Sequence, residues 1–292
     1  EGQHEIRCSY VGYKTLIETI DLSANQNHDI ILQNEAQLDE VVVTTDLNSP
    51  LLKTQTGKLS LSQKDIKTEY ALLSSPDVIK TLQRTSGVAD GMELASGLYV
   101  HGGNGDENLF LLDGTPLYHT NHSLGLFSSF NADVVKNVDF YKSGFPARYG
   151  GRLSSVIDVR TADGDLYKTH GSYRIGLLDG AFHIGGPIRK GKTSYNFGLR
   201  RSWMDLLTRP AFAIMNHKSN DEDKLSMSYF FHDLNFKLTN IFNERSRMSL
   251  SVYSGEDRLD AKDEWHSNNS SGYNDVDIYV NRFHWGNFNA AL

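Results

Sequence analysis

The chain has 292 residues, of which 39% are hydrophobic and 22% are charged, and its formal net charge at pH 7 is −7. The length leaves room for two domains. The negative charge and the lack of any run of Lys or Arg argue against nucleic acid as a partner, because phosphate binding needs a basic face. No stretch approaches the roughly 18 apolar residues of a membrane-spanning helix, which excludes a helical membrane protein. A membrane β-barrel stays open, because its strands alternate apolar and polar residues.

Residues 1–34 contain two short alternating runs, HEIRCSYVGYKTLIETIDL and HDIILQN, on either side of SANQN. This pattern predicts paired strands with a loop between them. Such short strands cannot bury a core alone, so they either complete a sandwich or pack on another element. The last residues, NRFHWGNFNAAL, show no turn signal. We therefore expect both ends of the chain to lie within domains.

Residues 35–57 combine an acidic start, a β-branched run at 41–43 and a polar stretch that contains proline. The composition predicts a linker with one strand-prone segment. A free strand edge in a linker can pair with a strand of another protein. An ordinary strand of a neighbouring domain explains the same run equally well.

A helix is predicted within residues 74–87, SSPDVIKTLQRTSG. Ser75 is expected to cap it, Pro76 suits its first position, and Gly87 suits the left-handed residue that ends it. One face of this helix is apolar and is expected to pack on a sheet. The strands of that sheet are predicted at 98–100, 108–114, 134–142 and 153–161, which gives a mixed α/β domain.

The candidate site residues of this domain lie in a loop with the sequence YHTNHS. His119 and His122 are three residues apart and could bind a metal, but no third ligand has a suitable spacing, so ordinary loop histidines are favoured. Tyr118, His119, Asn121 and His122 would also suit contact with a polar ligand. The glycine-rich loop at 102–108 lacks the Lys and Ser/Thr of a P-loop. No catalytic motif is present, so we predict no enzyme, no cofactor and no metal.

Residues 166–292 show the weak alternation of barrel strands. Apolar residues occupy positions 195, 197 and 199, positions 234, 236 and 238, and positions 248, 250 and 252, and mostly polar residues separate them. Short connections at 189–192 and 243–246 alternate with long, polar, irregular ones at 204–225 and 256–274. This predicts transmembrane strands, with a soluble sandwich as the alternative. The apolar phase slips near Asn281 or Arg282, where we predict a bulge.

Residues 98–161 resemble the plug domain of TonB-dependent receptors, particularly the Bacteroidetes type. The pieces NLFLLDG, YKSGFPARYGGR and SSVIDVR carry the resemblance, in that order. Upstream, CSYVGYKTLIETIDL and IILQ resemble the last strands of a carboxypeptidase regulatory-like domain, and LDEVVVT resembles a TonB box. One departure is His101, where the family usually has Arg before the glycines.

The resemblance implies four parts: the truncated end of a regulatory-like β-sandwich at 1–35, a TonB box and linker at 36–57, a plug at 58–163, and the first strands of an incomplete transmembrane β-barrel at 164–292. It places the protein in the cell outer membrane, with the plug seated in a barrel of about 22 strands. The implied function is energised uptake of a large or scarce ligand, namely a siderophore, vitamin, glycan or peptide. The alternative is a signalling or adhesion receptor on the same scaffold without transport.

The resemblance also implies partners and binding residues. TonB, which acts with ExbB and ExbD, would bind the box by strand addition. Outer-membrane lipid, an extracellular ligand and a surface lipoprotein are the other expected partners. Arg148, Tyr149 and Gly150 of the sequence ARYG would seat the plug in the barrel through a charge-assisted bond. The box residues are Leu38, Asp39, Glu40, Val41, Val42, Val43 and Thr44.

Overall fold

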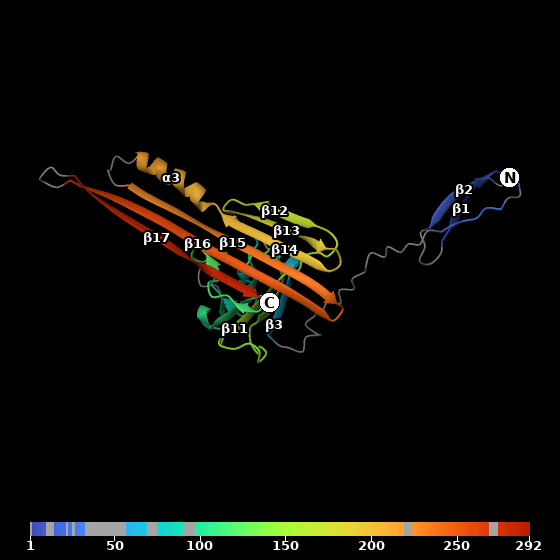
Figure 1. Ribbon diagram of the computed structural model, residues 1–292, viewed down its shortest axis with the longest axis horizontal. Coiled ribbons are helices and arrows are strands. Elements are labelled where there is room, and N and C mark those ends of the chain that lie inside the picture. The colour runs from blue at the N-terminus through green and yellow to red at the C-terminus, as the bar shows by residue number, and fades with distance from the viewer. Residues whose placement is uncertain are drawn as a thin grey trace. The chain divides into compact units, whose positions relative to one another are not determined.

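The computed structural model describes residues 2–9, 15–21, 23–24, 27–32, 57–68, 75–89, 97–218, 224–268 and 274–292 (Figure 1). The chain divides into two compact units, Glu1–Lys53 and Thr54–Leu292, each described by itself. The predicted TonB box at 38–44 lies outside the described residues.

The first unit contains an antiparallel hairpin of β1 (Gln3–Cys8) and β2 (Leu16–Asp21). The predicted pair of strands is therefore confirmed. The second predicted run is not a strand over its described part, residues 28–32. Assignment of this unit to a β-sandwich stays a prediction.

The part of the second unit that is predicted to be the plug, and is called the plug below, is built on a five-stranded sheet in the order β3-β10-β11-β6-β7. Strand β6 runs parallel to β11, and the other neighbours are antiparallel. Two short helices, α1 (Gln63–Thr68) and α2 (Val78–Gln83), and two-stranded ribbons complete it. The sheet strands are β3 (Lys58–Ser62), β6 (Asn108–Leu112), β7 (Thr115–Pro116), β10 (Val135–Tyr141) and β11 (Ser155–Thr161). The ribbons are β4 (Val88–Ala89) with β5 (Tyr99–Val100) and β8 (Asn121–His122) with β9 (Phe127–Ser128).

Helix α2 begins two residues later than predicted, because Asp77 rather than Ser75 is its N-cap. The Asp77 carboxylate accepts hydrogen bonds from the backbone N–H of Ile79 at 2.8 Å and of Lys80 at 3.1 Å. The Ser75 hydroxyl instead donates to Asp179, which belongs to the second, six-stranded sheet described below, so its predicted capping role is wrong. Gly87 does have a positive φ of 78°, but the helix already ends at Gln83.

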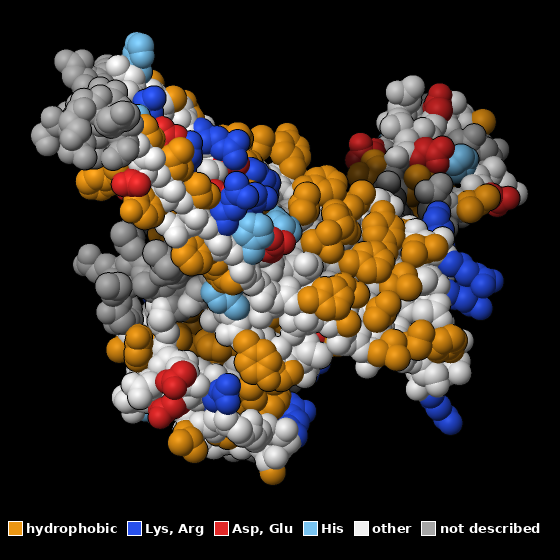
Figure 2. Space-filling model, turned by 60° about the vertical axis from the view of Figure 1, so that its left-hand side comes forward, with side chains coloured by type: hydrophobic (Ala, Val, Ile, Leu, Met, Phe, Trp, Pro, Cys, Tyr) orange, Lys and Arg blue, Asp and Glu red, His pale blue; other side chains and the backbone are white. Residues whose placement is uncertain are grey.

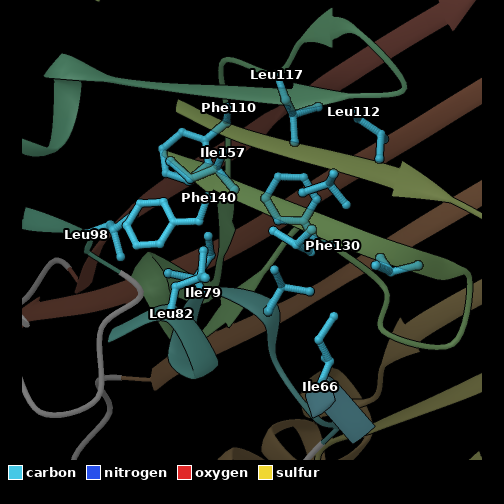
Figure 3. Packing of buried hydrophobic residues seen from close by; sticks show 14 of the residues in the cluster. Ile66, Ile79, Leu82, Leu98, Phe110, Leu112, Leu117, Phe130, Phe140 and Ile157 are labelled. Atoms are coloured by element: carbon cyan, nitrogen blue, oxygen red, sulfur yellow. The ribbon is translucent and has the colours of Figure 1, made fainter. Parts of the chain in front are cut away.

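The core of the plug forms where α2 packs on the sheet. The apolar face of α2 is fully buried, as the spacing predicted. Its side chains point toward those of the sheet in Figure 3. The aromatic rings of Phe110 and Phe130 stack in this core with centroids 6.3 Å apart. The buried members from α2 and the sheet include Val78, Ile79, Leu82, Phe110, Phe140 and Ile157.

Six antiparallel strands in chain order form the second sheet, which we call the large sheet. They are β12 (His170–Ile175), β13 (Asp179–Arg189), β14 (Thr193–Ser202), β15 (Lys224–Asn243), β16 (Ser246–Asn268) and β17 (Asn274–Ala291). Its register aligns Phe197 with Phe236 and Val252, which places the predicted apolar residues on one face. No described helix is long and apolar enough to span a membrane. The predicted fold class, a mixed α/β plug followed by antiparallel barrel strands, is confirmed.

Two details of the strand prediction are wrong. The connection predicted as irregular at 204–225 contains a helix, α3 (Met204–Lys218), and residues 256–268 continue β16. The predicted bulge near Asn281 is absent, because β16 and β17 keep one register from Ser251–Ala291 to Asn268–Asn274. The apparent slip arises because Trp285 lies on the inner face of the sheet, where it packs beside Tyr229.

Candidate functional site

The plug meets the polar inner face of the large sheet through the loop around β8. His122 of this loop is buried, and both of its ring nitrogens contact carboxylates. Nε2 lies 2.8 Å from Oδ1 of Asp233, and Nδ1 lies 2.6 Å from Oδ2 of Asp257. A neutral imidazole can donate through only one nitrogen, so two carboxylates favour the imidazolium form. Burial by itself lowers the pKa of His122, but the two carboxylates raise it to about 9.

Arg200 of β14 supplies the second cation at this place. Its Nε lies 2.8 Å from Oδ2 of Asp233, and its Nη2 donates to the carbonyl oxygen of Ser128 in the plug. The side chains of His122, Arg200, Asp233 and Asp257 are each at most 1% exposed. We call these four residues the buried charge cluster. Two cations face two carboxylates, so the cluster is neutral, which is the condition under which charges can stay buried.

Hydroxyl and aromatic groups complete the buried charge cluster. The Tyr253 hydroxyl donates to Asp233 at 2.7 Å, and the Tyr229 hydroxyl donates to Asp257. The ring of His122 stacks on Phe231 with centroids 4.4 Å apart and planes 2° apart. These neighbours fix the position of the imidazole and satisfy the remaining acceptor sites of the carboxylates.

His119 attaches the same loop to β17. Trp285 Nε1 donates to Nε2 of His119 at 2.9 Å. The side-chain amide of Asn287 accepts from the His119 backbone N–H at 3.1 Å and donates to its carbonyl oxygen at 2.5 Å. The loop is therefore bonded to β14, β15, β16 and β17.

His119, His122 and Asp257 offer ligand atoms that lie within 4.8 Å of one another, which makes them the one group among the described residues that could hold a metal ion. The third ligand comes from β16, which explains why spacing within the loop did not reveal it. In this structure the nitrogens of both histidines serve protein groups instead, since His122 binds two carboxylates and His119 accepts from Trp285. The absence of a metal stays a prediction.

The other predicted site residues have different surroundings. The Tyr118 side chain is 81% exposed, and Asn121 is half-buried. Arg148 donates to the Tyr149 hydroxyl at 2.7 Å, and this hydroxyl donates to Asp158 at 2.9 Å, so these contacts lie within the plug. Burial and Asp158 raise the pKa of Tyr149. Ligand contact by the YHTNHS loop and plug seating by the ARYG sequence both stay predictions.

Sequence reasoning missed a second group of contacts, which centres on Lys237 of β15. Its Nζ donates to the carbonyl oxygen of Thr161 at 2.9 Å and lies 3.4 Å from Asp113 and 3.5 Å from Asp163. Ser251 of β16 also donates to Asp113, at 2.6 Å. Plug and sheet together line a cavity of about 320 Å³ beside these groups. The sequence does contain a signal for this contact, because Lys237 stands at a polar position within a predicted membrane strand. A charge at such a position must face the lumen and pair with another group there.

Backbone and side chain approach closely where the plug crosses β14. A Cβ atom at Gly198 would lie 2.2 Å from Cγ1 of Val134 in the plug. Only glycine fits here without movement of Val134. Gly198 therefore allows the plug to lie directly against the backbone of β14.

Comparison with known proteins identifies the plug. Residues 51–156 match the family model described as "TonB-dependent Receptor Plug Domain". Receptors with this domain are outer-membrane proteins, which confirms the predicted location. No curated protein matches the chain.

Three solved structures to which the chain is similar have sequence identities of 14–16%. The ferric enterobactin receptor PfeA of Pseudomonas aeruginosa is 16% identical, with a TM-score of 0.46, 72% of this chain covered and 34% of that one. The siderophore receptor PirA of Pseudomonas aeruginosa is 14% identical, with a TM-score of 0.46 and coverage of 81% and 43%. PirA of Acinetobacter baumannii is 14% identical, with a TM-score of 0.40 and coverage of 82% and 45%. The chain thus spans less than half the length of these receptors.

Proposed function

We propose that this chain is part of a TonB-dependent outer-membrane receptor that imports a ligand too large or too scarce for passive diffusion, and that it is not an enzyme. The observation that carries the proposal is the plug match over residues 51–156 together with the bonding of this plug to the polar face of an antiparallel sheet. A plug held in this way blocks the lumen, so import needs work done on it from outside the barrel.

TonB would supply this work through residues 38–44. Pairing would run along the main chain of the LDEVVVT segment, and ExbB and ExbD would energise TonB. The ligand would reach the plug at the YHTNHS loop, where the exposed ring of Tyr118 is available for contact. The ligand classes that suit such a receptor are siderophores, vitamins, glycans and peptides.

The N-terminal unit would be the end of a carboxypeptidase regulatory-like domain, as in receptors of the Bacteroidetes type. The antiparallel β1–β2 hairpin ahead of the box supports this order of parts. A surface lipoprotein would be a further partner of such a receptor.

The proposal is tested in the whole receptor with Val42→Pro, which removes one backbone donor from the pairing strand. Uptake should be lost while ligand binding is kept, and Asn48→Pro, outside the box, should leave both unchanged. A synthetic 36–46 peptide should bind the periplasmic C-terminal domain of TonB in an NMR titration, and the proline should abolish this binding. Unimpaired uptake by Val42→Pro would refute the box assignment. Ligand binding without any accumulation by the unmodified receptor would favour a signalling or adhesion receptor.

A further inference from the structure

The apolar side of the large sheet changes from outward to inward along the strands. Near the turn between β15 and β16, the outward residues are apolar, as in the aligned row of Phe236, Val252 and Ala290. The inward residues at this level are polar, as in the aligned pair of Lys237 and Ser251. Toward the other end, beside α3, the apolar residues point inward instead. The register has no shift in that part, so the sequence pattern, and not the backbone, exchanges the two sides.

A cluster of apolar side chains covers the inner face at this end of the sheet. Leu259 of β16 lies opposite Phe283 of β17. Met227 and Leu225 point to the same side from β15, and Tyr279 does so four residues from Phe283. We call these five residues the inner apolar patch. Leu225, Met227, Tyr279 and Phe283 are 43%, 42%, 59% and 53% exposed, so the described residues leave much of the patch uncovered.

The outward residues behind the inner apolar patch are mostly charged. On β16, Arg258 pairs with Asp260 at 3.0 Å, and Lys262 pairs with Glu264. On one face of the molecule in Figure 2, a broad apolar area adjoins a group of acidic, basic and histidine side chains, which is the same change of character. A strand needs only about 9–11 residues to span a membrane, so β16, with 23 residues, continues well past the lipid. The patch therefore belongs to the part of the sheet that has water behind it.

The inner apolar patch ends at the YHTNHS loop of the plug. One row below the patch, Phe231 stacks on His122, and Trp285 donates to His119. Tyr118, the chain neighbour of His119, is exposed in the same loop. The longer connections of outer-membrane barrels are extracellular, and α3 lies in such a connection. A ligand that enters from outside therefore passes the patch before it reaches the plug loop.

The chemistry of the inner apolar patch favours an apolar ligand over a glycan. The interior of such a barrel is ordinarily polar, and an exposed apolar cluster marks a binding site. Sugar hydroxyls placed against Leu225, Met227 and Leu259 would lose hydrogen bonds to water without replacement, which costs free energy. An aliphatic or aromatic group would gain free energy from the same contact. Asp263 and Asn281, which lie between members of the patch, leave room for a polar group at its margin.

We propose that the inner apolar patch binds an aliphatic or aromatic part of the imported ligand before this ligand reaches the plug loop. The inference rests on the proposed function and narrows its ligand classes to molecules that carry such a part, which excludes unsubstituted glycans. Binding at the patch needs neither TonB nor movement of the plug, because the patch belongs to the strands alone.

The test uses the whole receptor in nanodiscs and saturation-transfer NMR, with empty nanodiscs as the blank for partition into lipid. The probes are a tetrapeptide of two phenylalanines and two leucines, its analogue with asparagine and serine at those positions, and maltotetraose. The unmodified receptor should bind the apolar peptide and transfer little saturation to the other two probes. The double variant Met227→Asn and Phe283→Asn should bind the apolar peptide at least about tenfold more weakly, because two apolar contacts are lost. Met227→Leu with Phe283→Leu should keep most of the binding.

The matched control is Ile278→Asn with Val280→Asn, which makes the same kind of change on the outward side of β17. All four replaced side chains are at least 42% exposed, so the sheet should keep its fold, and the control should bind like the unmodified receptor. Equal loss in both Asn variants would overturn the proposal, as would unchanged binding by Met227→Asn with Phe283→Asn. So would tighter binding of maltotetraose, or no binding of the apolar peptide by the unmodified receptor. The assay contains no TonB, so the Val42→Pro uptake experiment decides the proposed function separately.

Discussion

His122 of the plug and Asp233 of β15 form a buried ion pair with Nε2 2.8 Å from Oδ1, although 111 residues separate them in the chain. Asp257 holds the other nitrogen of the same ring, and Arg200 holds the other oxygen of Asp233. Plug and sheet therefore share one neutral cluster. Removal of one member leaves an uncompensated charge in a place that water does not reach.

Replacement of His122 by Gln removes a cation and leaves Asp257 with the more distant ring of His119, whose Nε2 lies 3.6 Å from Oδ2 of Asp257. Breaking a buried pair costs about 3–5 kcal/mol, so we expect the plug loop to open far more often. Hydrogen exchange of residues 117–131 in the whole receptor measures this opening. His119→Gln is the matched control, because its ring is partly exposed, and it should raise the exchange rate much less. Equal protection in both variants would contradict a special role of His122.

The same pair makes docking dependent on pH. Burial lowers the pKa of His122, but the carboxylates of Asp233 and Asp257 outweigh this effect and raise the pKa from 6.5 to about 9. A raised pKa in the folded state contributes stability that is fully present below pH 6.5 and is lost as the pH rises through about 9. The difference in protection between the unmodified receptor and His122→Gln should therefore shrink between pH 7 and pH 10. Comparison at each pH cancels the intrinsic change in exchange rate, and a constant difference would refute the imidazolium form.

Local sequence patterns predicted the helices and strands of this fold better than the contacts between them. The apolar face of α2 and the alternation that aligns Phe197 with Phe236 follow from periodicities that each segment carries within itself. The buried charge cluster joins residues from four separate segments. No local pattern predicts that the plug loop with His122 packs on the polar face of β14, β15 and β16. The polar character of residues 256–274 predicts an irregular connection, so the sequence does not place Asp257 in a strand. The slip of the apolar phase before Trp285 predicts a bulge, whereas the residue lies on the inner face of a strand with unbroken register.

Gly198 is expected to accept no side chain. In Gly198→Ala the new Cβ would lie 2.2 Å from Cγ1 of Val134, and overpacking of this kind costs about 1–3 kcal/mol. The temperature at which the purified receptor unfolds should fall. Val134→Ala in the same chain removes the clashing methyl group and should restore part of the loss. Gly105→Ala is the control, because its nearest neighbour would be 3.9 Å away. No change in Gly198→Ala would mean that the plug moves aside at no cost.

Asn216 of α3 covers the edge of β15 beyond the end of β14. Its Nδ2 donates to the carbonyl oxygen of Leu225 at 2.8 Å, and its Oδ1 accepts from the Leu225 N–H at 3.2 Å, as a neighbouring strand would. Asn216→Asp keeps the acceptor and loses the donor, so we expect about 1 kcal/mol less local stability. Faster hydrogen exchange at the start of β15 would report it. His217→Asn, one residue further along α3, serves as the control, and equal exchange in both variants would show that the edge needs no such cover.

Lys237 links β15 to the plug and to the segment that follows it. Only 11% of its side chain is exposed, and Asp113, Asp163 and the carbonyl oxygen of Thr161 surround its ammonium group. Burial opposes ionisation of Asp163, but Lys237 and its other neighbours lower the pKa of this carboxyl group. Lys237→Met keeps the approximate length of the side chain and removes the cation that Asp113 and Asp163 share, so residues 161–165 should exchange faster in the whole receptor. Lys136→Met removes a cation that is 60% exposed and 3.8 Å from Asp163, where solvent screening leaves an ion pair worth at most about 1 kcal/mol. A loss of protection confined to Lys237→Met would identify this buried lysine as the second point that holds the plug to the sheet, whereas equal losses would reduce it to one charge among several around Asp163.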